Sequence, residues 1–263
     1  MDLGLKGKRA LVTGASAGLG LAAAEALAGE GAALVINSRS EENLKKAASI
    51  MQSKTGHKPD FIAGDLSIQG RAEEIARKAI ALLGGIDILV SNAGGPPAGK
   101  FPQHDRETWD KATTLTLHSA IDLTRALLSG MKERGWGRII YITSVAVRQP
   151  IDNLIISNTL RAGLTGFAKS LSNEMAAFGI TVNTVLPGYT DTDRLKVLAR
   201  TNAEVSGQDI DAIYSGWTSS IPAGRVGRPE ELAALIAFLA SEKASYITGT
   251  AIPVDGGIVK ALL

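Results

Sequence analysis

The sequence predicts a single α/β domain over residues 1–263, with a doubly wound sheet of seven mostly parallel strands covered by helices on both faces. Short apolar runs rich in Val, Ile and Leu alternate with longer helical patterns along the chain. Strands that are apolar on both faces are typical of a buried parallel sheet. With 263 residues, of which 45% are hydrophobic and 21% charged, the chain can bury such a core in one domain.

The first two strand–helix units have clear boundary signals. Residues 9–14 read as a strand ending in a glycine turn, and 21–31 as a helix closing at a glycine. Residues 32–39 read as the second strand. The helix predicted over 40–56 begins with a serine N-cap followed by two acids, a strong start signal.

The next two units follow the same alternation. Residues 61–66 form the third predicted strand, and the helix over 71–85 ends in a glycine pair. The fourth strand, 86–95, leads into a long helical pattern over 109–135.

The last three strands complete the predicted sheet. They lie at 138–144, 180–188 and 249–257, with helices over 154–178 and 231–241 between them. Right-handed crossovers between parallel strands then give the doubly wound order.

One long segment, 189–228, is predicted to be irregular and to bind substrate. It leaves the carboxyl end of the sixth strand, where open α/β sheets bind their ligands. Loops of this length are usually lids or binding loops.

Composition excludes several classes of function. The formal net charge is +2 without a long basic run, which argues against nucleic-acid binding. The absence of cysteine excludes thiolate catalysis, disulfides and cysteine metal sites, and the three histidines show no ligand spacing. No apolar run approaches the roughly 20 residues that span a bilayer, and no leader pattern is visible, so we expect a cytoplasmic protein without a membrane partner.

A glycine-rich turn, TGASAGLG, follows the first strand and opens the first helix. Gly14, Gly18 and Gly20 would let a pyrophosphate approach the helix N-terminus, where free N–H groups favour an anion. The same glycines also suit a plain tight turn, so the turn by itself leaves both readings open.

Further motifs, in order, resemble those of the short-chain dehydrogenase/reductase family. SNAGG follows the fourth strand, LPGYTDTD follows the sixth, and GRPEELAALIAFLAS with ITGTAIPVDGG resembles the family's C-terminal signature. The resemblance covers nearly the whole chain, is nearest to the 3-oxoacyl-carrier-protein reductases, and implies a Rossmann-type fold, a nicotinamide cofactor and a homotetramer. It places these residues at the cofactor: Gly14, Ser16, Gly18, Leu19, Gly20, Asp65, Leu66, Asn92, Ala93, Gly94, Arg161, Pro187, Gly188, Thr190 and Thr192.

Charge at the end of the second strand favours NADP(H) over NAD(H). An acid there would bind the ribose 2′-hydroxyl of NAD, but Ser38 takes its place and Arg39 follows. A guanidinium suits a 2′-phosphate. A solvated surface arginine is the alternative, and the basic residue that such proteins often carry within the glycine turn is replaced by Ala17.

The resemblance also implies a catalytic set that this chain has changed. Ser144 fits the serine that holds the substrate oxygen. The positions of the family's tyrosine, lysine and asparagine are occupied by Ser157, Arg161 and Thr116. An aliphatic hydroxyl is a far weaker acid than a phenol, whose pKa is about 10, and an arginine cannot release a proton.

The resemblance implies that the chain transfers hydride between the cofactor and a small carbonyl or secondary alcohol. Three explanations of the changed catalytic residues are open. Ser157 and Arg161 still serve the reaction, with Ser144 donating a hydrogen bond. Alternatively, another side chain supplies the proton. Tyr189 is the best candidate, and Tyr141, Asp152 and His118 are weaker candidates. In the third, the site is catalytically idle and the protein is a dinucleotide-binding regulator or scaffold.

Apolar residues near the C-terminus suggest two surfaces. Ile213, Tyr214 and Trp217 indicate either a partly apolar substrate pocket or the packing of a short helix. The last strand and the final VKALL are candidate interface material for the homotetramer.

Overall fold

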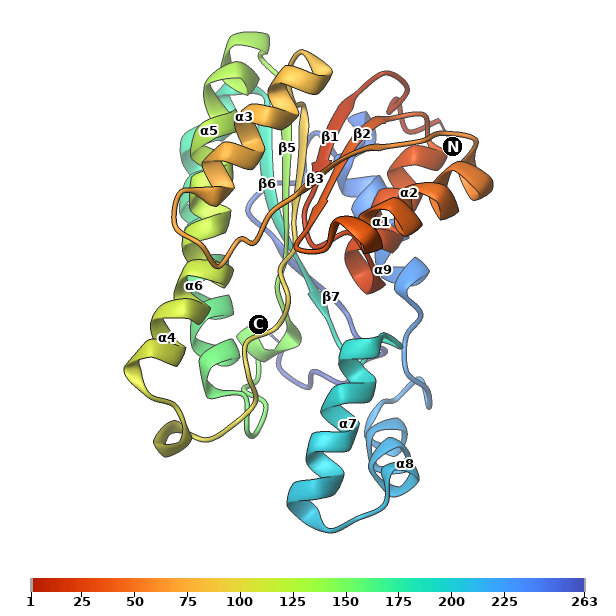
Figure 1. Cartoon of the computed structure of the whole chain (residues 1–263), viewed down its shortest axis with the longest axis vertical. Coiled ribbons are helices and arrows are strands. Elements are labelled where there is room, and N and C mark those ends of the chain that lie inside the picture. Colours follow the sequence, from red (N-terminus) through yellow and green to blue (C-terminus); the bar gives the residue numbers. More distant parts are fainter. Residues whose placement is uncertain (1, 263) are drawn as a thin grey trace.

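The computed structural model describes residues 2–262 and confirms the seven-stranded parallel sheet. The strand order is β3-β2-β1-β4-β5-β6-β7, so the chain starts in the middle and winds first to one edge, then to the other (Figure 1). The strands are β1 Arg9–Val12, β2 Ala33–Ser38, β3 Asp60–Ala63, β4 Ile88–Ser91, β5 Gly137–Ile142, β6 Ile180–Pro187 and β7 Ala251–Val254. The order reverses between β1 and β4, which is where such sheets open a ligand crevice.

Helices cover both faces of the sheet, as predicted (Figure 1). Helices α1 (Gly18–Gly29), α2 (Glu41–Thr55) and α9 (Pro229–Ala240) share one apolar core with the sheet. A second core lies under α3 (Arg71–Leu83), α5 (Ser119–Arg134) and α6 (Ile155–Met175). Within residues 2–262, no helix has both the length and the apolar character to cross a membrane.

The predicted irregular segment 189–228 is mostly helical, so that prediction was wrong. It forms α7 (Asp193–Ser206) and α8 (Ile210–Ser220), which project beyond the carboxyl end of β6 (Figure 1). Thr192 and Asp209 cap the two helices by accepting hydrogen bonds from backbone N–H groups. The cap residues are visible in the sequence, but the short apolar faces of the two helices pack in a small separate cluster with Tyr189 and Val226.

Aromatic packing holds this helical pair together. The Trp217 ring stacks on that of Tyr189, with centroids 4.7 Å apart, and Tyr214 meets it edge-on at 5.3 Å. Ile213 and Trp217 are buried in the same cluster. Of the two interpretations of these residues, packing of a short helix is therefore confirmed.

The long helix predicted over 109–135 is interrupted by a wider turn. It consists of α4 (Arg106–Thr113), a π-helical turn over Thr114–His118, and α5. Such turns within α-helices often mark functional sites, and this one contains Thr116.

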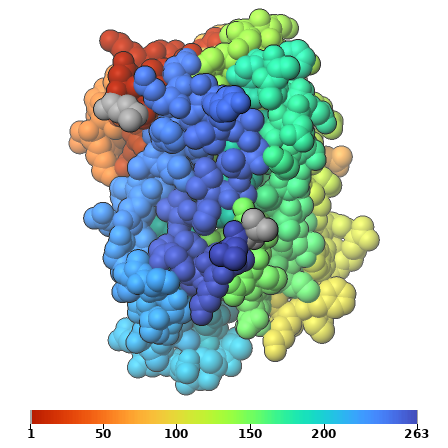
Figure 2. All heavy atoms as spheres, turned by 180° about the vertical axis from the view of Figure 1, so that it is seen from behind, coloured from red at the N-terminus to blue at the C-terminus, as the bar shows by residue number. Residues whose placement is uncertain are grey.

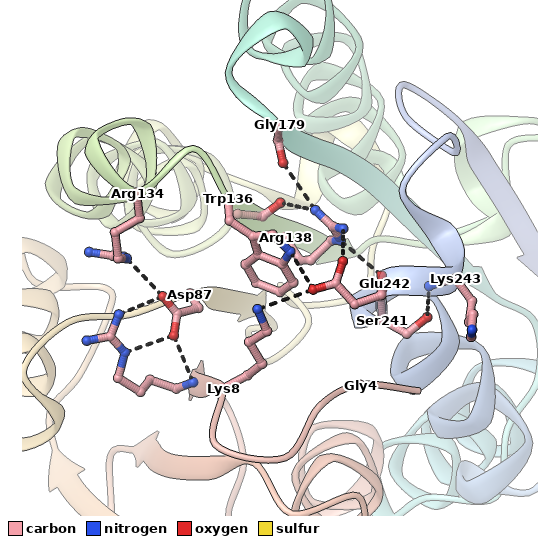
Figure 3. Close-up of polar contacts among 12 residues, drawn as sticks. Gly4, Lys8, Asp87, Arg134, Trp136, Arg138, Gly179, Ser241, Glu242 and Lys243 are labelled. Atoms are coloured by element: carbon pink, nitrogen blue, oxygen red, sulfur yellow. Dashed lines mark hydrogen bonds and ion pairs between the residues drawn. The ribbon is translucent and has the colours of Figure 1, made fainter. Parts of the chain in front are cut away.

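The amino ends of the strands are closed by a polar cluster, drawn in Figure 3. The Trp136 ring lies between two cations, with Lys8 Nζ 3.7 Å and Arg138 Cζ 4.3 Å from its centroid. Arg138 is buried and donates to the carbonyls of Gly137, Gly179 and Ser241. One buried guanidinium thus satisfies three backbone carbonyls at this end of the sheet.

Asp87 anchors the same end of the sheet and makes stability depend on pH. It accepts hydrogen bonds from Arg9 Nε and Nη2 at 2.8 and 2.7 Å and from Arg134 Nε at 3.0 Å. Burial alone would raise the pKa of Asp87, but these two guanidinium groups outweigh burial and hold the pKa below its ordinary value. The contribution is therefore present at neutral pH and is lost as pH falls through the lowered pKa.

We expect Asp87→Asn to lower the free energy of unfolding at pH 7 by about 1–3 kcal/mol, the usual range for hydrogen bonds to charged groups. The deficit should shrink between pH 7 and about pH 3, because below the ordinary aspartate pKa of about 4 the wild type loses this contribution as pH falls toward the lowered folded-state pKa. Urea unfolding at both pH values measures it. Glu41→Gln, which removes an exposed carboxylate paired with Lys45, is the control and should change little. A deficit equal at both pH values would contradict the assignment.

Candidate active site

A cavity of about 660 Å³ opens at the carboxyl ends of the strands. Its wall comes from the segments that follow β1, β4, β5 and β6, together with the starts of α6 and α7. Ile258 and Val259 contribute from the C-terminal segment, shown in dark blue on the rear face in Figure 2.

Most of the predicted site residues line this one cavity. They are Gly14, Gly18, Leu19, Asn92, Ala93, Gly94, Ser144, Ser157, Arg161, Pro187, Gly188, Thr190 and Thr192. The remaining predicted residues lie outside its wall: Ser16, Gly20, Ser38, Arg39, Asp65, Leu66 and Thr116.

The glycine turn after β1 is packed so tightly against Asn92 that side chains do not fit. A Cβ on Gly14 would lie 2.8 Å from Asn92 Nδ2, and one on Gly20 would meet the Gly14 carbonyl. Asn92 holds the turn by donating from Nδ2 to Gly14 O at 3.2 Å. At the start of α1, Ala17 offers no side-chain cap, so the first N–H groups stay available. A bare backbone at an uncapped helix N-terminus fits a pyrophosphate.

The residues that the resemblance places at the adenosine half of a cofactor lie at the ends of β2 and β3. Gly64 N donates to Ser38 O at 2.9 Å and thus joins the two strand ends. Asp65 Oδ1 accepts from Ser67 N at 2.9 Å, which fixes its carboxylate. Arg39 is exposed and makes no hydrogen bond or ion pair within residues 2–262.

Arg161 is held against the end of β5. Its Nη1 donates to the carbonyls of Ile142 and Thr143 at 3.0 and 2.8 Å, and its Nε donates to Ser157 Oγ at 3.1 Å. The i, i+4 spacing of these two residues on α6 thus becomes a direct contact. Burial, with the charge of Arg194 in addition, lowers the pKa of Arg161 to about 10, so the guanidinium remains charged at neutral pH.

Two serine hydroxyls are oriented by the protein as acceptors. Ser157 Oγ accepts from Arg161, and Ser144 Oγ accepts from Ala146 N at 3.1 Å. Each hydroxyl therefore keeps its proton for a donor bond. Both residues line the cavity, so each can donate to an oxygen bound there.

Thr116 is buried in the π-helical turn, and its Oγ1 has no hydrogen-bond partner within residues 2–262. It lies outside the cavity wall, so the structure places the fourth predicted catalytic residue behind the site rather than in it.

The alternative acids are poorly placed or poorly tuned. Tyr141 is fully buried against Thr124, and burial raises its pKa. His118 is exposed and does not line the cavity. Tyr189 and Asp152 do line it, but burial and the charge of Asp152 raise the pKa of the Tyr189 phenol. That direction is opposite to the one a proton donor at neutral pH needs.

Several residues of the cavity were not among those predicted, and Arg194 is the one whose charge bears most on the chemistry. Arg194, in the first turn of α7, lines the wall and donates from Nη2 to Pro96 O at 2.7 Å. The signal was its position directly after LPGYTDTD, but the segment was predicted to be irregular, so the side chain had no predicted direction.

Comparison with known proteins identifies the family. The model of the family described as Enoyl-(Acyl carrier protein) reductase matches residues 14–259. A curated relative, the 3-oxoacyl-[acyl-carrier-protein] reductase FabG of Aquifex aeolicus, is 36% identical over 258 residues, covering 98% of this chain and 100% of the relative. The chain belongs to the short-chain dehydrogenase/reductase family.

Solved structures of the short-chain dehydrogenase/reductase family agree with this chain in fold. L-Sorbose reductase from Gluconobacter frateurii, complexed with NADPH and L-sorbose, is 35% identical with a TM-score of 0.93, and 100% of both chains is covered. YwfH, an NADPH-dependent reductase of bacilysin biosynthesis, is 34% identical with a TM-score of 0.92 over 98% of this chain and 100% of YwfH. The predicted resemblance is confirmed, and the protein is an NAD(P)-dependent short-chain dehydrogenase/reductase.

Proposed function

We propose that this enzyme reduces a small carbonyl compound with NADP(H), or oxidises the corresponding secondary alcohol, and that Ser144, Ser157 and Arg161 together replace the usual tyrosine and lysine. One observation supports this proposal above the others. Arg161 Nε donates to Ser157 Oγ, so a fixed positive charge lies behind a hydroxyl whose proton is free to point into the cavity.

The residues of the chain act on the substrate oxygen. The cofactor, when bound, supplies hydride to the carbonyl carbon. The pair of electrons of the C=O bond then moves to oxygen, where Ser144 and Ser157 donate hydrogen bonds and the charge of Arg161 stabilises the negative charge that develops. Solvent supplies the proton that completes the alcohol, and the Ser157 hydroxyl relays it because Arg161 cannot.

The two candidate acids are separated by single substitutions. We expect Ser157→Ala to lower kcat/KM about 10²-fold, the usual cost of one donor to a developing oxyanion. Tyr189→Phe, which removes only a hydroxyl of raised pKa, should retain most of the activity. Loss of NADPH absorbance across a panel of ketones and aldehydes is the measurement. Activity lost in Tyr189→Phe but kept in Ser157→Ala would overturn the proposal.

The preference for NADP(H) is attributed to Arg39. Its guanidinium is exposed and unpaired within residues 2–262, and no acid stands at Ser38 to repel a 2′-phosphate. L-Sorbose reductase was solved in complex with NADPH and YwfH is an NADPH-dependent reductase, which supports the same choice.

We expect Arg39→Ala to weaken NADPH binding about 10-fold or more and to leave NADH binding nearly unchanged, because only NADPH offers the phosphate partner. Nicotinamide fluorescence on titration gives both affinities. Arg77→Ala, at another solvent-facing arginine outside the cavity, is the matched control. An unchanged NADPH/NADH affinity ratio would refute the role of Arg39.

A second candidate function is a dinucleotide-binding regulator without turnover. The observation in its favour is the Arg161 guanidinium. Within residues 2–262, two of its three hydrogen bonds go to backbone carbonyls and can serve structure alone. Tight NADPH binding without turnover of any ketone, aldehyde or 3-oxoacyl thioester would favour this function. The homotetramer stays a prediction.

A further inference from the structure

Two arginines share the cavity, and neither forms an ion pair within residues 2–262. Arg161 lies at the end of β5 with its hydrogen bonds going to two carbonyls and one hydroxyl. Arg194 lines the same cavity from α7, and within residues 2–262 its hydrogen bond also goes to a carbonyl, that of Pro96. Carbonyl and hydroxyl oxygens accept hydrogen bonds from the two guanidinium groups. Because these acceptors are neutral, they leave both positive charges uncompensated.

Arg194 lies across the segment that follows β4. A Cβ placed on Gly95 would lie 3.0 Å from Arg194 Nε, so the guanidinium occupies the space directly above that glycine. The contact with Pro96 O fixes its direction. The residue is nevertheless partly exposed, and it lines the cavity, so its remaining N–H groups can meet a ligand.

The charges around these arginines do not balance them. Burial lowers the pKa of Arg194, and the charge of Arg194 adds to the burial that lowers the pKa of Arg161. Two acids line the cavity, Asp152 and Asp193, and both are exposed. Asp193 Oδ1 pairs with Lys196 Nζ at 3.3 Å. Among residues 2–262, no carboxylate forms an ion pair with either arginine, and none offsets the lowering of their pKa values. An anionic ligand is stabilised under these conditions.

We propose that the substrate is a small oxo acid, or the matching hydroxy acid in the reverse direction, whose carboxylate binds Arg194 while its carbonyl oxygen lies at Ser144 and Ser157. This inference rests on the proposed function, whose site it shares. The guanidinium suits a carboxylate because it offers two parallel donors.

The pyrophosphate of the cofactor is the other anion that enters this crevice. Its expected place is the glycine turn, where Thr192 Cγ2 lies 3.3 Å from the position of a Cβ on Gly18. Arg194 lies two residues further along and over Gly95 instead, on the side of the segment after β4. The experiment must therefore separate a carboxylate on the substrate from a phosphate on the cofactor.

The test compares Arg194→Met with Arg200→Met, an exposed arginine of the same helix that does not line the cavity. Each variant and the wild type is given a panel of 2-oxo, 4-oxo and 5-oxo acids, each as the acid and as its methyl ester, so that the spacing between carboxylate and carbonyl varies along the panel. NADPH affinity is measured by fluorescence. Binding of acid and ester to the enzyme–NADPH complex is measured separately by quenching, so that a result is obtained without turnover.

We expect the wild type to prefer at least one acid over its ester by about 10- to 100-fold in kcat/KM, the range for a charged hydrogen-bonded pair. Arg194→Met should reduce that ratio to near one while NADPH affinity changes less than about twofold, and Arg200→Met should resemble the wild type. Equal use of acids and esters by the wild type would overturn the substrate class and leave the proposed reductase intact. A large loss of NADPH affinity in Arg194→Met with an unchanged ratio would assign the arginine to the cofactor and also overturn it.

If no ketone is reduced, the proposed function fails, and the quenching experiment alone decides the binding site. Acid that binds the enzyme–NADPH complex more tightly than ester, and loses this advantage in Arg194→Met only, would support the anion site. Equal binding of acid and ester would overturn it.

Discussion

The double variant Ser157→Tyr with Arg161→Lys should raise the rate of ketone reduction by about 10²- to 10³-fold, within the usual contribution of a positioned general acid. A phenol next to an ammonium has its pKa lowered toward neutrality, whereas the serine hydroxyl does not titrate in the working range. Position 157 lines the cavity and position 161 lies one turn further along α6, so both new side chains face the substrate. Single-turnover and steady-state rates with the ketone panel measure the gain.

The single variants show which half of the pair matters. Ser157→Tyr alone places a phenol beside the retained guanidinium, which can lower its pKa but cannot refill its proton. Arg161→Lys alone removes the donors that now reach Ile142 O and Thr143 O at 3.0 and 2.8 Å. Its thermal stability must therefore be compared with that of the double variant. A well-folded double variant with no gain on any ketone would mean that the cavity is shaped for another reaction.

The sheet was predictable because its signals are local. Each strand is a short apolar run bounded by glycine, serine or an acid, and the alternation with helices leaves few topologies for a parallel sheet. Ser40 was predicted as an N-cap, and its Oγ does accept from Asn43 N. The two helices between Tyr189 and Arg228 were missed because their apolar residues face one another, and their packing partners are absent from the linear pattern.

The sequence predicted many of the residues that line the candidate site, but it did not predict the contacts between them. The spacing of Ser157 and Arg161 required that they share a helix face, and the structure gives their contact as 3.1 Å. Nothing in the spacing shows that Arg161 also reaches back to Thr143 O, since that bond crosses 18 residues. Arg194 was not predicted as a site residue for the same reason, because its hydrogen bond to Pro96 O joins segments that are 98 residues apart.

Gly20→Ala should abolish measurable NADPH binding and lower the free energy of unfolding by about 1–3 kcal/mol, the usual cost of forcing an extra carbon into a packed site. The added Cβ would meet the carbonyl of Gly14 and lie 2.8 Å from Asn92 Nδ2. The first of these neighbours is backbone and cannot rotate away. The turn must then open, which breaks the bond from Asn92 Nδ2 to Gly14 O and displaces the free N–H groups at the start of α1.

The matched control lies in the same helix. A Cβ on Gly29 has no neighbour within 4 Å, so Gly29→Ala should leave NADPH binding unchanged and stabilise the protein by up to about 1 kcal/mol, the helix-propensity difference between the two residues. Fluorescence titration and urea unfolding of both variants give the comparison. NADPH affinity retained in Gly20→Ala would mean that the glycine turn is only a tight connection between β1 and α1. The pyrophosphate would then have to bind elsewhere along the cavity. Arg161 and Arg194 both line the cavity without an ion pair within residues 2–262, so the partner assigned to Arg194 would need to change.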